Sequence, residues 1–173
     1  NTYALFAELC YATINKNGRS GLVLPTALIT GTTTRFFFEE LMHSQRLASF
    51  IGFDNEEKTL FPDIDNNLTF AAVTMAGRAQ QAPVFCFIFR RFDQVADTSR
   101  YVPITEADLA LLNPNTLTCP VFRSPRDAEV VRFVYRRLPV LWKDSDPKGN
   151  NWELNFSTMF HAKGAAHLFR DEN

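Results

Sequence analysis

The sequence predicts an α/β fold in which an open sheet with an antiparallel edge strand is followed by a smaller, mainly helical extension. Residues 21–77 run as apolar segment, helical pattern, apolar segment, polar loop and β-rich segment, an order typical of α/β sheets. Beyond a polar linker at 93–103, the clear local signals are two helix starts. The chain is therefore expected to have two parts, residues 1–92 and 93–173.

Four short runs rich in apolar and β-forming residues predict the strands. They span residues 21–24, 47–53, 68–75 and 83–89. A helix joins the first two strands, which favours a right-handed parallel crossover. The short route from Phe53 to Leu68 permits the third strand to run antiparallel at the end of the sheet.

Helices are predicted by apolar residues at helical spacing and by cap residues. They are expected at residues 2–15, at 32–47 with threonines capping the start, after the capping box Thr105–Asp108, and from Ser124 and Pro125 onward. On the last helix, one apolar face is expected to carry Ala128, Val131, Tyr135 and Leu138. Residues 144–151 predict a turn, and residues 152–160 a strand or a helix.

Composition excludes few function classes. The formal charge of −1 lacks the strongly basic balance of many nucleic-acid-binding domains. Three cysteines without close spacing suggest neither a disulfide framework nor a zinc site, and the three scattered histidines suggest no other metal site. With no signal peptide and no apolar run of membrane length, a cytoplasmic location without membrane contact is expected.

Seventeen phenylalanines are the unusual feature of the composition. Core packing is the favoured role for any one of them. Such an excess can also form apolar surfaces that pack against another part of a larger domain, because a domain cut in two exposes its interior. The chain is therefore expected to self-associate through an exposed apolar edge.

Several local strings together resemble a known family. They are Tyr3-x-x-Phe6, Gly18-Arg-Ser-Gly-Leu-Val-Leu-Pro25, Phe61-Pro62 after an acidic loop, Asn113–Arg123, Arg126–Glu129 and Tyr135–Arg137. They resemble the gamma-type adenine-N6 DNA methyltransferases of large, Type IIG-like restriction-modification enzymes and phage-defence systems. The resemblance covers nearly the whole chain and corresponds to the C-terminal part of the methyltransferase domain, which implies a partial Rossmann-like methyltransferase sheet.

The resemblance also implies what lies outside this sequence. These enzymes bind S-adenosylmethionine with a glycine-rich turn and orient the target amine with an Asn-Pro-Pro-aromatic tetrapeptide. The chain contains no Gly-x-Gly and no Pro-Pro pair. We therefore expect a fragment of a larger enzyme that uses S-adenosylmethionine and double-stranded DNA, with no catalytic residue, cofactor binding or activity in this chain alone.

The candidate site residues fall into three groups. In the family, the loop matching Phe61 and Pro62 stacks against the flipped target base, which has lost its stacking in the duplex. Possible substrate or DNA contacts are Pro25 and Thr26 at the end of a strand, Asn66 and Asn67 in the loop, and Arg123, Arg126, Arg132 and Arg136. No metal ligand is expected.

Three alternatives stay open. The arginine-bearing helix from Pro125 to Arg137 could belong to a non-catalytic module that binds DNA or a partner protein. Glu56-Glu57-Lys58, followed by Asp63, approximates the acidic motif of a metal-dependent nuclease. Cytosine-N4 methyltransferases share the same sheet, so the target base could also be cytosine.

Overall fold

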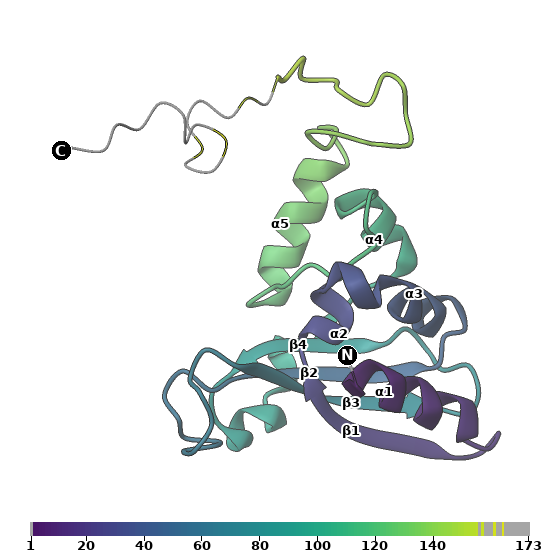
Figure 1. Cartoon of the computed structure of the whole chain (residues 1–173), viewed down its shortest axis with the longest axis vertical. Helices are drawn as coiled ribbons and strands as arrows, with labels where there is room; N and C mark the ends of the chain where they lie inside the picture. The colour runs from purple at the N-terminus through teal and green to yellow at the C-terminus, as the bar shows by residue number, and fades with distance from the viewer. Residues whose placement is uncertain (1, 156, 158–160, 162–163, 165–173) are drawn as a thin grey trace. The chain divides into compact units, whose positions relative to one another are not determined.

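The computed structural model describes residues 2–155, 157, 161 and 164, and within them the centre is an open, five-stranded mixed sheet (Figure 1). The strands are β1 (Arg19–Pro25), β2 (Leu47–Asp54), β3 (Thr69–Ala76), β4 (Val84–Phe89) and β5 (Val102–Pro103). Across the sheet their order is β1-β3-β2-β4-β5. The predicted α/β class and the four predicted strands are confirmed.

β3, the strand predicted to run antiparallel at the edge, lies inside the sheet. β3 pairs antiparallel with β1 on one side and with β2 on the other, while β2 and β4 are parallel. β1 and β2 therefore run in the same direction, as the helical crossover predicted, with β3 between them. The edges are β1 and the short β5, which is antiparallel to β4. A short connection permits either position for β3, so the sequence indicated its direction but not its place.

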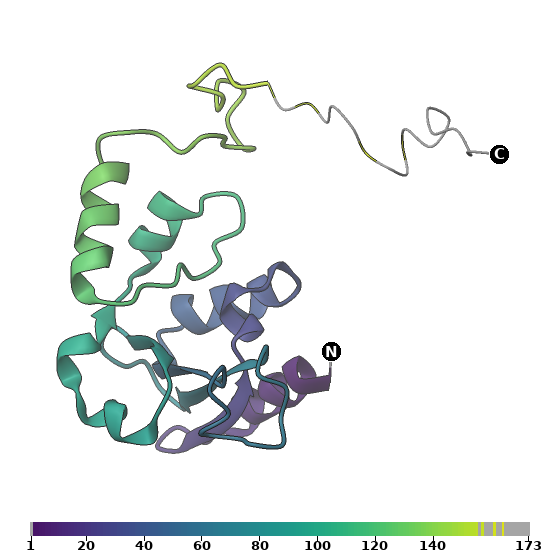
Figure 2. The same ribbon diagram turned by 90° about the vertical axis from the view of Figure 1, so that its left-hand side faces the viewer.

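Helices cover one face of this sheet. They are α1 (Thr2–Thr13), α2 (Ala27–Thr30), α3 (Arg35–His43), α4 (Glu106–Leu112) and α5 (Pro125–Tyr135). α4 and α5 lie side by side beyond α2 and α3 in both views (Figures 1 and 2). The larger hydrophobic core joins helices and strands through fully buried side chains such as Leu28, Phe38, Phe50 and Phe85.

A smaller core lies on the opposite face of the sheet. Its buried members are Phe53, Cys86 and Phe89, and partly buried Val95 and Tyr101 pack against them. These two residues belong to or flank the 3-10 turns η2 (Phe92–Ala96) and η3 (Thr98–Arg100), in the segment expected to be a polar linker. The segment thus covers the second face of the sheet with Val95 and Tyr101, whereas its Val102 belongs to the larger core.

The threonine run does not cap α3 as expected. Thr32–Thr34 form a 3-10 turn. The hydroxyl of Thr34 donates to the carbonyl of Ala27 at 2.7 Å and accepts no backbone N–H of α3, as a cap would. Gly31 lies so close to the preceding turn that a β carbon there would be 2.6 Å from the Ala27 carbonyl oxygen. The sequence did not reveal α2, because four residues are too few for a periodic pattern.

The caps of the last two helices are confirmed. The Thr105 hydroxyl accepts from the N–H of Asp108, and the Asp108 carboxylate accepts from the N–H of Thr105 at 3.0 Å. Ser124 accepts from the N–H of Asp127, and Pro125 opens α5. The expected apolar face packs only in its first half: Ala128 and Val131 are buried or partly buried, whereas Tyr135 and Leu138 are exposed.

The chain divides into two compact units, residues 1–139 and 140–173. The sheet and all five helices named above belong to the first unit, and the boundary expected near residue 92 stays a prediction. In the second unit the Gly149 N–H donates to the Asp146 carbonyl at 2.8 Å, within the predicted turn. Residues 152–155 are neither helix nor strand, and most of the element expected at 152–160 lies outside the described residues. None of the described helices has the length and apolar character needed to cross a membrane.

Candidate functional site

The carboxyl ends of β1, β2 and β4 lie on one side of the sheet, and a pocket of about 470 Å³ opens there. We call it the strand-end pocket. Open α/β sheets bind ligands at this position. Thr26 and Arg123, both predicted as contact residues, line the pocket, whereas Phe61 and Pro62 do not.

Hydroxyl groups form one wall of the strand-end pocket. The hydroxyls of Thr26 and Thr69 lie 2.5 Å apart, and the Thr26 N–H donates to the Thr69 carbonyl at 3.3 Å. Pro25, the last residue of β1, is exposed beside them. Because one proton is enough for the bond between two hydroxyls, the second hydroxyl proton of the pair can be donated to a ligand.

The floor of the strand-end pocket contains a β-bulge. Ile51 pairs with Cys86 and Phe53 pairs with Phe89, so β4 holds one extra residue at this point. Ile88 lies in the bulge with φ of 60°, a conformation that is strained for a β-branched residue. Gly52 is in close contact with the bulge, since a β carbon there would lie 3.3 Å from the Cys86 carbonyl oxygen. The strained residue thus lies in the floor of the pocket, and strained backbone is often found at functional sites.

Carboxylates surround one of the two arginines of the pocket. Arg90 forms ion pairs with Glu56, with Glu57 at 3.0 Å and with Asp54 at 3.8 Å. The hydrogen bond from Arg90 to Glu57, followed by the charge of Glu56, raises the pKa of the Arg90 guanidinium. Glu56 and Glu57 of the nuclease alternative are thus paired with an arginine, and the described residues contain no cluster of metal-binding side chains.

The side chain of Asn55 organises the loop between β2 and β3. Asn55 is fully buried; its Nδ2 donates to the carbonyl of Phe61 at 2.9 Å and its Oδ1 accepts from the N–H of Phe61 at 3.0 Å. Nδ2 also lies 3.4 Å from the carbonyl of Ile64. Asn55 was not among the predicted site residues, although an asparagine directly after a strand and before a long polar loop is a recognisable turn signal.

Phe61 is held at the end of the sheet with part of its ring uncovered. Its ring meets that of Phe70 edge to face at 4.7 Å between centroids, and Phe70 stacks on Phe53 at 5.3 Å. The side chain of Phe61 is 37% exposed. Since one part of the ring is supported and another part faces solvent, Phe61 can offer an aromatic surface to a base.

The loop asparagines have a different environment. Asn66 and Asn67 are exposed, and the N–H of Asn67 donates to the carboxylate of Asp65 at 2.8 Å in a turn. Their side chains make no hydrogen bond with the described residues. They lie in the same loop as exposed Pro62, on the chain between Phe61 and β3.

The candidate arginines beyond residue 120 fall into two classes. Arg132 is engaged: Nε donates to Asp108 at 2.8 Å, Nη2 donates to the same carboxylate at 2.9 Å, and Nη2 also contacts the Pro103 carbonyl. Burial acts to raise the pKa of Asp108, but the hydrogen bonds from Arg132 and Thr105 outweigh it and hold the pKa below its ordinary value. Arg132 therefore fastens α5 to α4 and has little capacity left for DNA.

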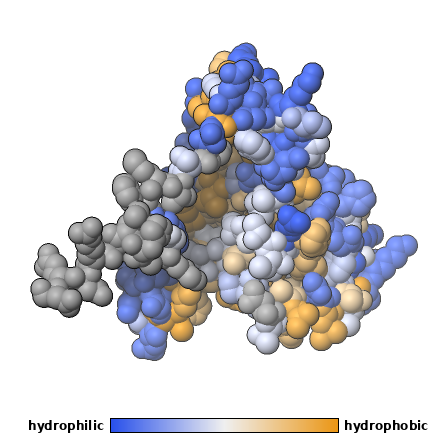
Figure 3. Space-filling view, turned by 45° about the horizontal axis from the view of Figure 1, so that its top comes forward, coloured by the Kyte–Doolittle hydropathy of each residue, from blue (hydrophilic) through white to orange (hydrophobic). Residues whose placement is uncertain are grey.

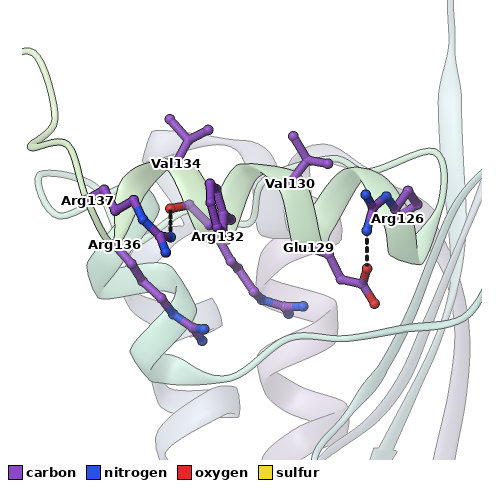
Figure 4. A pocket seen from close by; sticks show the side chains of 8 residues that line it. Arg126, Glu129, Val130, Arg132, Val134, Arg136 and Arg137 are labelled. Carbon is purple, nitrogen blue, oxygen red and sulfur yellow. Dashed lines mark hydrogen bonds and ion pairs between the residues drawn. The ribbon is translucent and has the colours of Figure 1, made fainter.

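The other arginines of this region are exposed. Arg126 forms an ion pair with Glu129 at 3.1 Å, drawn as a dashed line in Figure 4. The guanidinium of Arg137 lies 3.5 Å from the ring centroid of Phe133. Arg136 points away from Val130 and Val134 in the same view. The side chains of Arg123 and Arg136 form no ion pair or hydrogen bond with the described residues, so they are the candidates free to meet a phosphate.

Comparison with known proteins adds no identification. No protein-family model, no curated protein and no solved structure matches this chain.

Proposed function

We propose that this chain forms the target-base side of an S-adenosylmethionine-dependent DNA methyltransferase that modifies adenine N6 in a Type IIG-like restriction-modification or phage-defence enzyme. The observation that carries the proposal is the position of Phe61 at the strand ends, where Asn55 fixes its backbone and Phe70 supports its ring. The resemblance assigns base stacking to this loop. A flipped adenine would regain there part of the stacking that it loses on leaving the duplex.

The order of elements supports the same proposal. β1, the helices α2 and α3, β2, a loop and the antiparallel β3 follow one another as expected for the C-terminal half of a Rossmann-like methyltransferase sheet. The methyl donor and the groups that polarise the amine would come from a part of the enzyme outside these 173 residues. In this proposal the chain binds and orients the base but does not activate it.

The open side of the sheet is where the rest of the enzyme would pack. Among the described residues β1 is hydrogen-bonded to a strand on one side only, where β3 lies, and its Val23 is 65% exposed. On α1, beside β1, the apolar residues Leu5, Phe6 and Leu9 are more than half exposed. Figure 3 shows apolar residues, in orange, among the polar ones on one face of the molecule. An unpaired strand next to exposed apolar side chains can accept further strands and helices.

Methyl transfer by the intact parent protein tests this function. We expect labelled methyl groups to pass from S-adenosylmethionine to adenine N6 in double-stranded DNA. Phe61→Ala should lower kcat/KM about tenfold to hundredfold, because one stacking contact contributes about 1–3 kcal/mol. The matched control is Phe92→Ala, which removes a phenylalanine that is 60% exposed and contacts Phe53 outside the loop; it should leave kcat/KM within about twofold.

Three results would contradict the proposal in different ways. Absence of methyl transfer would reject the activity, and a product methylated at cytosine N4 would reject adenine as the target. Calorimetric titration of the 173-residue chain with S-adenosylmethionine should give no binding heat, with or without a duplex containing a mismatched target. Stoichiometric binding of the cofactor would show that the chain holds a complete donor site.

A second candidate function is a DNA-binding or protein-interaction module without catalysis. The unpartnered guanidinium groups of Arg123 and Arg136 favour it, because cations without local partners can meet phosphates. DNA binding by the chain should then weaken steeply with salt, and Arg136→Ala should reduce the salt dependence by about one counterion. Arg132→Ala is not suitable for this test, because Arg132 holds Asp108.

A further inference from the structure

We infer that the strand-end pocket binds a nucleoside phosphate, with the ring system on its apolar floor and the phosphate on Arg123. Phe61 and Pro62 do not line this site, although Glu56 of the same loop does, and the inference does not depend on methyl transfer. The pocket has about 470 Å³, which is enough for one nucleotide. Its apolar, polar and charged lining groups match the ring, the hydrogen-bonding groups and the anion of a nucleotide.

The floor suits a planar ring. Phe53, Phe87, Ile88 and Val121 line the pocket. Phe53 and Phe87 are only 5% and 4% exposed, so the accessible apolar surface is mainly that of partly buried Ile88 and exposed Val121. Gly52 adds a place without a side chain, where bare backbone forms part of the wall. A heterocyclic base or a ribose could lie on this surface and remove it from water.

The lining contains two arginines, of which one is paired with carboxylates and the other is not. Arg90 is paired with Asp54 and Glu56 within the lining, and with Glu57 beside it. Arg123 lines the pocket and has no ion pair or hydrogen bond among the described residues. A ligand therefore finds one unpaired cation, which favours an anion of the size of a phosphate.

The loop that carries Arg123 is firmly attached. The N–H of Cys119 donates to the carbonyl of Ile29 at 2.9 Å, and Cys119 and Phe122 are both buried. Between and after these anchors, Val121 and Arg123 are exposed and line the pocket. The guanidinium is thus carried by a segment whose backbone is fixed at its base, which lowers the ordering cost of binding.

The remaining polar groups complete the match. Asp54 uses one carboxylate oxygen to accept from the N–H of Glu56 at 2.9 Å, and lone pairs remain for an amine or a sugar hydroxyl. The Thr26 and Thr69 pair can donate its second proton to a ligand oxygen. A nucleoside phosphate offers a ring, hydrogen-bond donors and an anion in one molecule, whereas inorganic phosphate or an apolar ligand would use only part of the lining.

The test is a titration of the ¹⁵N-labelled chain, followed by the amide signals of Thr26, Gly52, Ile88 and Arg123. AMP at millimolar concentrations should shift these signals in a saturable way, and adenosine should bind about tenfold more weakly because it lacks the phosphate. Arg123→Gln should remove this difference. The matched control is Arg126→Gln, an exposed arginine three positions away that does not line the pocket; it should leave the difference intact.

The ligand could be a nucleotide of a nucleic acid or a free nucleotide. Titration with a short single-stranded DNA without terminal phosphates distinguishes these two sources. Tighter binding of the strand than of AMP assigns the site to nucleic acid, and tighter binding of AMP assigns it to a free nucleotide; either result supports the inference. Shifts that do not saturate, shifts located away from the pocket, or an equal effect of the two arginine variants would overturn it.

Discussion

The side-chain amide of Asn55 binds both backbone hydrogen-bonding groups of Phe61, donating to its carbonyl at 2.9 Å and accepting from its N–H at 3.0 Å. Asn55 is fully buried at the end of β2, whereas the loop that it holds is mostly exposed. The position of the Phe61 ring therefore depends on a residue that has no access to a ligand.

Asn55→Ala should lower the free energy of unfolding by about 2 kcal/mol. The substitution leaves the N–H and carbonyl of Phe61 without their partner, and each such group costs about 1–3 kcal/mol where water cannot replace the bond. Urea unfolding gives the stability, and hydrogen exchange of the Phe61 amide should become faster. Asn67→Ala is the control, because Asn67 is exposed and its side chain makes no hydrogen bond with the described residues; it should stay within about 0.5 kcal/mol. Equal stabilities of the two variants would contradict the role of Asn55.

Arg132→Ala should destabilise the chain by about 3 kcal/mol. The ion pair with Asp108 is mostly buried, with 17% and 11% of the two side chains exposed, and removal of the arginine leaves a buried carboxylate unpaired. Arg126→Ala removes an ion pair whose side chains are 80% and 63% exposed, so it should change stability by at most about 0.5 kcal/mol. Chemical denaturation measures both, and a loss of the same size in Arg126→Ala would show that burial does not set the difference.

The same pair predicts a dependence on pH. The folded-state pKa of Asp108 lies below its ordinary value, so the folded state favours the ionised carboxyl. The stabilisation is complete above the unfolded pKa of about 3.9 and is lost as the pH falls through the lower folded pKa. The stability difference between the wild type and Asp108→Asn should thus be constant near neutrality and shrink below about pH 4. A difference for Asp108→Asn that grows on acidification would contradict the ion pair.

Local patterns could be read from the sequence, and long-range partners could not. The caps at Thr105 and Ser124 were predictable because each joins residues only three positions apart. The contact of Arg132 with Asp108 spans 24 positions and gives no local signal. Likewise, the spacing of strand residues predicted β3 but not its place between β1 and β2, which depends on pairing across the whole sheet.

The candidate site follows the same division. Thr26 and Arg123 were predicted individually, from a strand end and from the family resemblance, but only the fold brings them to one pocket. The bulge at Ile88 was not predictable, because an isoleucine within an apolar run indicates regular strand and a positive φ is rare for it. Arg132, a possible DNA contact, is bound to Asp108 of α4 in the structure, and its contact with DNA stays a prediction.

Val23→Lys should suppress self-association of the chain. Val23 lies on the edge strand β1, is 65% exposed and has an unpaired strand edge beside it, and a lysine on an edge strand opposes pairing with another strand because it brings charge and tightly held water. Sedimentation velocity over a range of concentrations should show association of the wild type and a monomer for Val23→Lys. The same substitution at Val130, which is 46% exposed on α5, should leave association unchanged. A wild type that is monomeric at every concentration would contradict an associating edge, and loss of association in Val130→Lys alone would place the contact on α5 instead of β1.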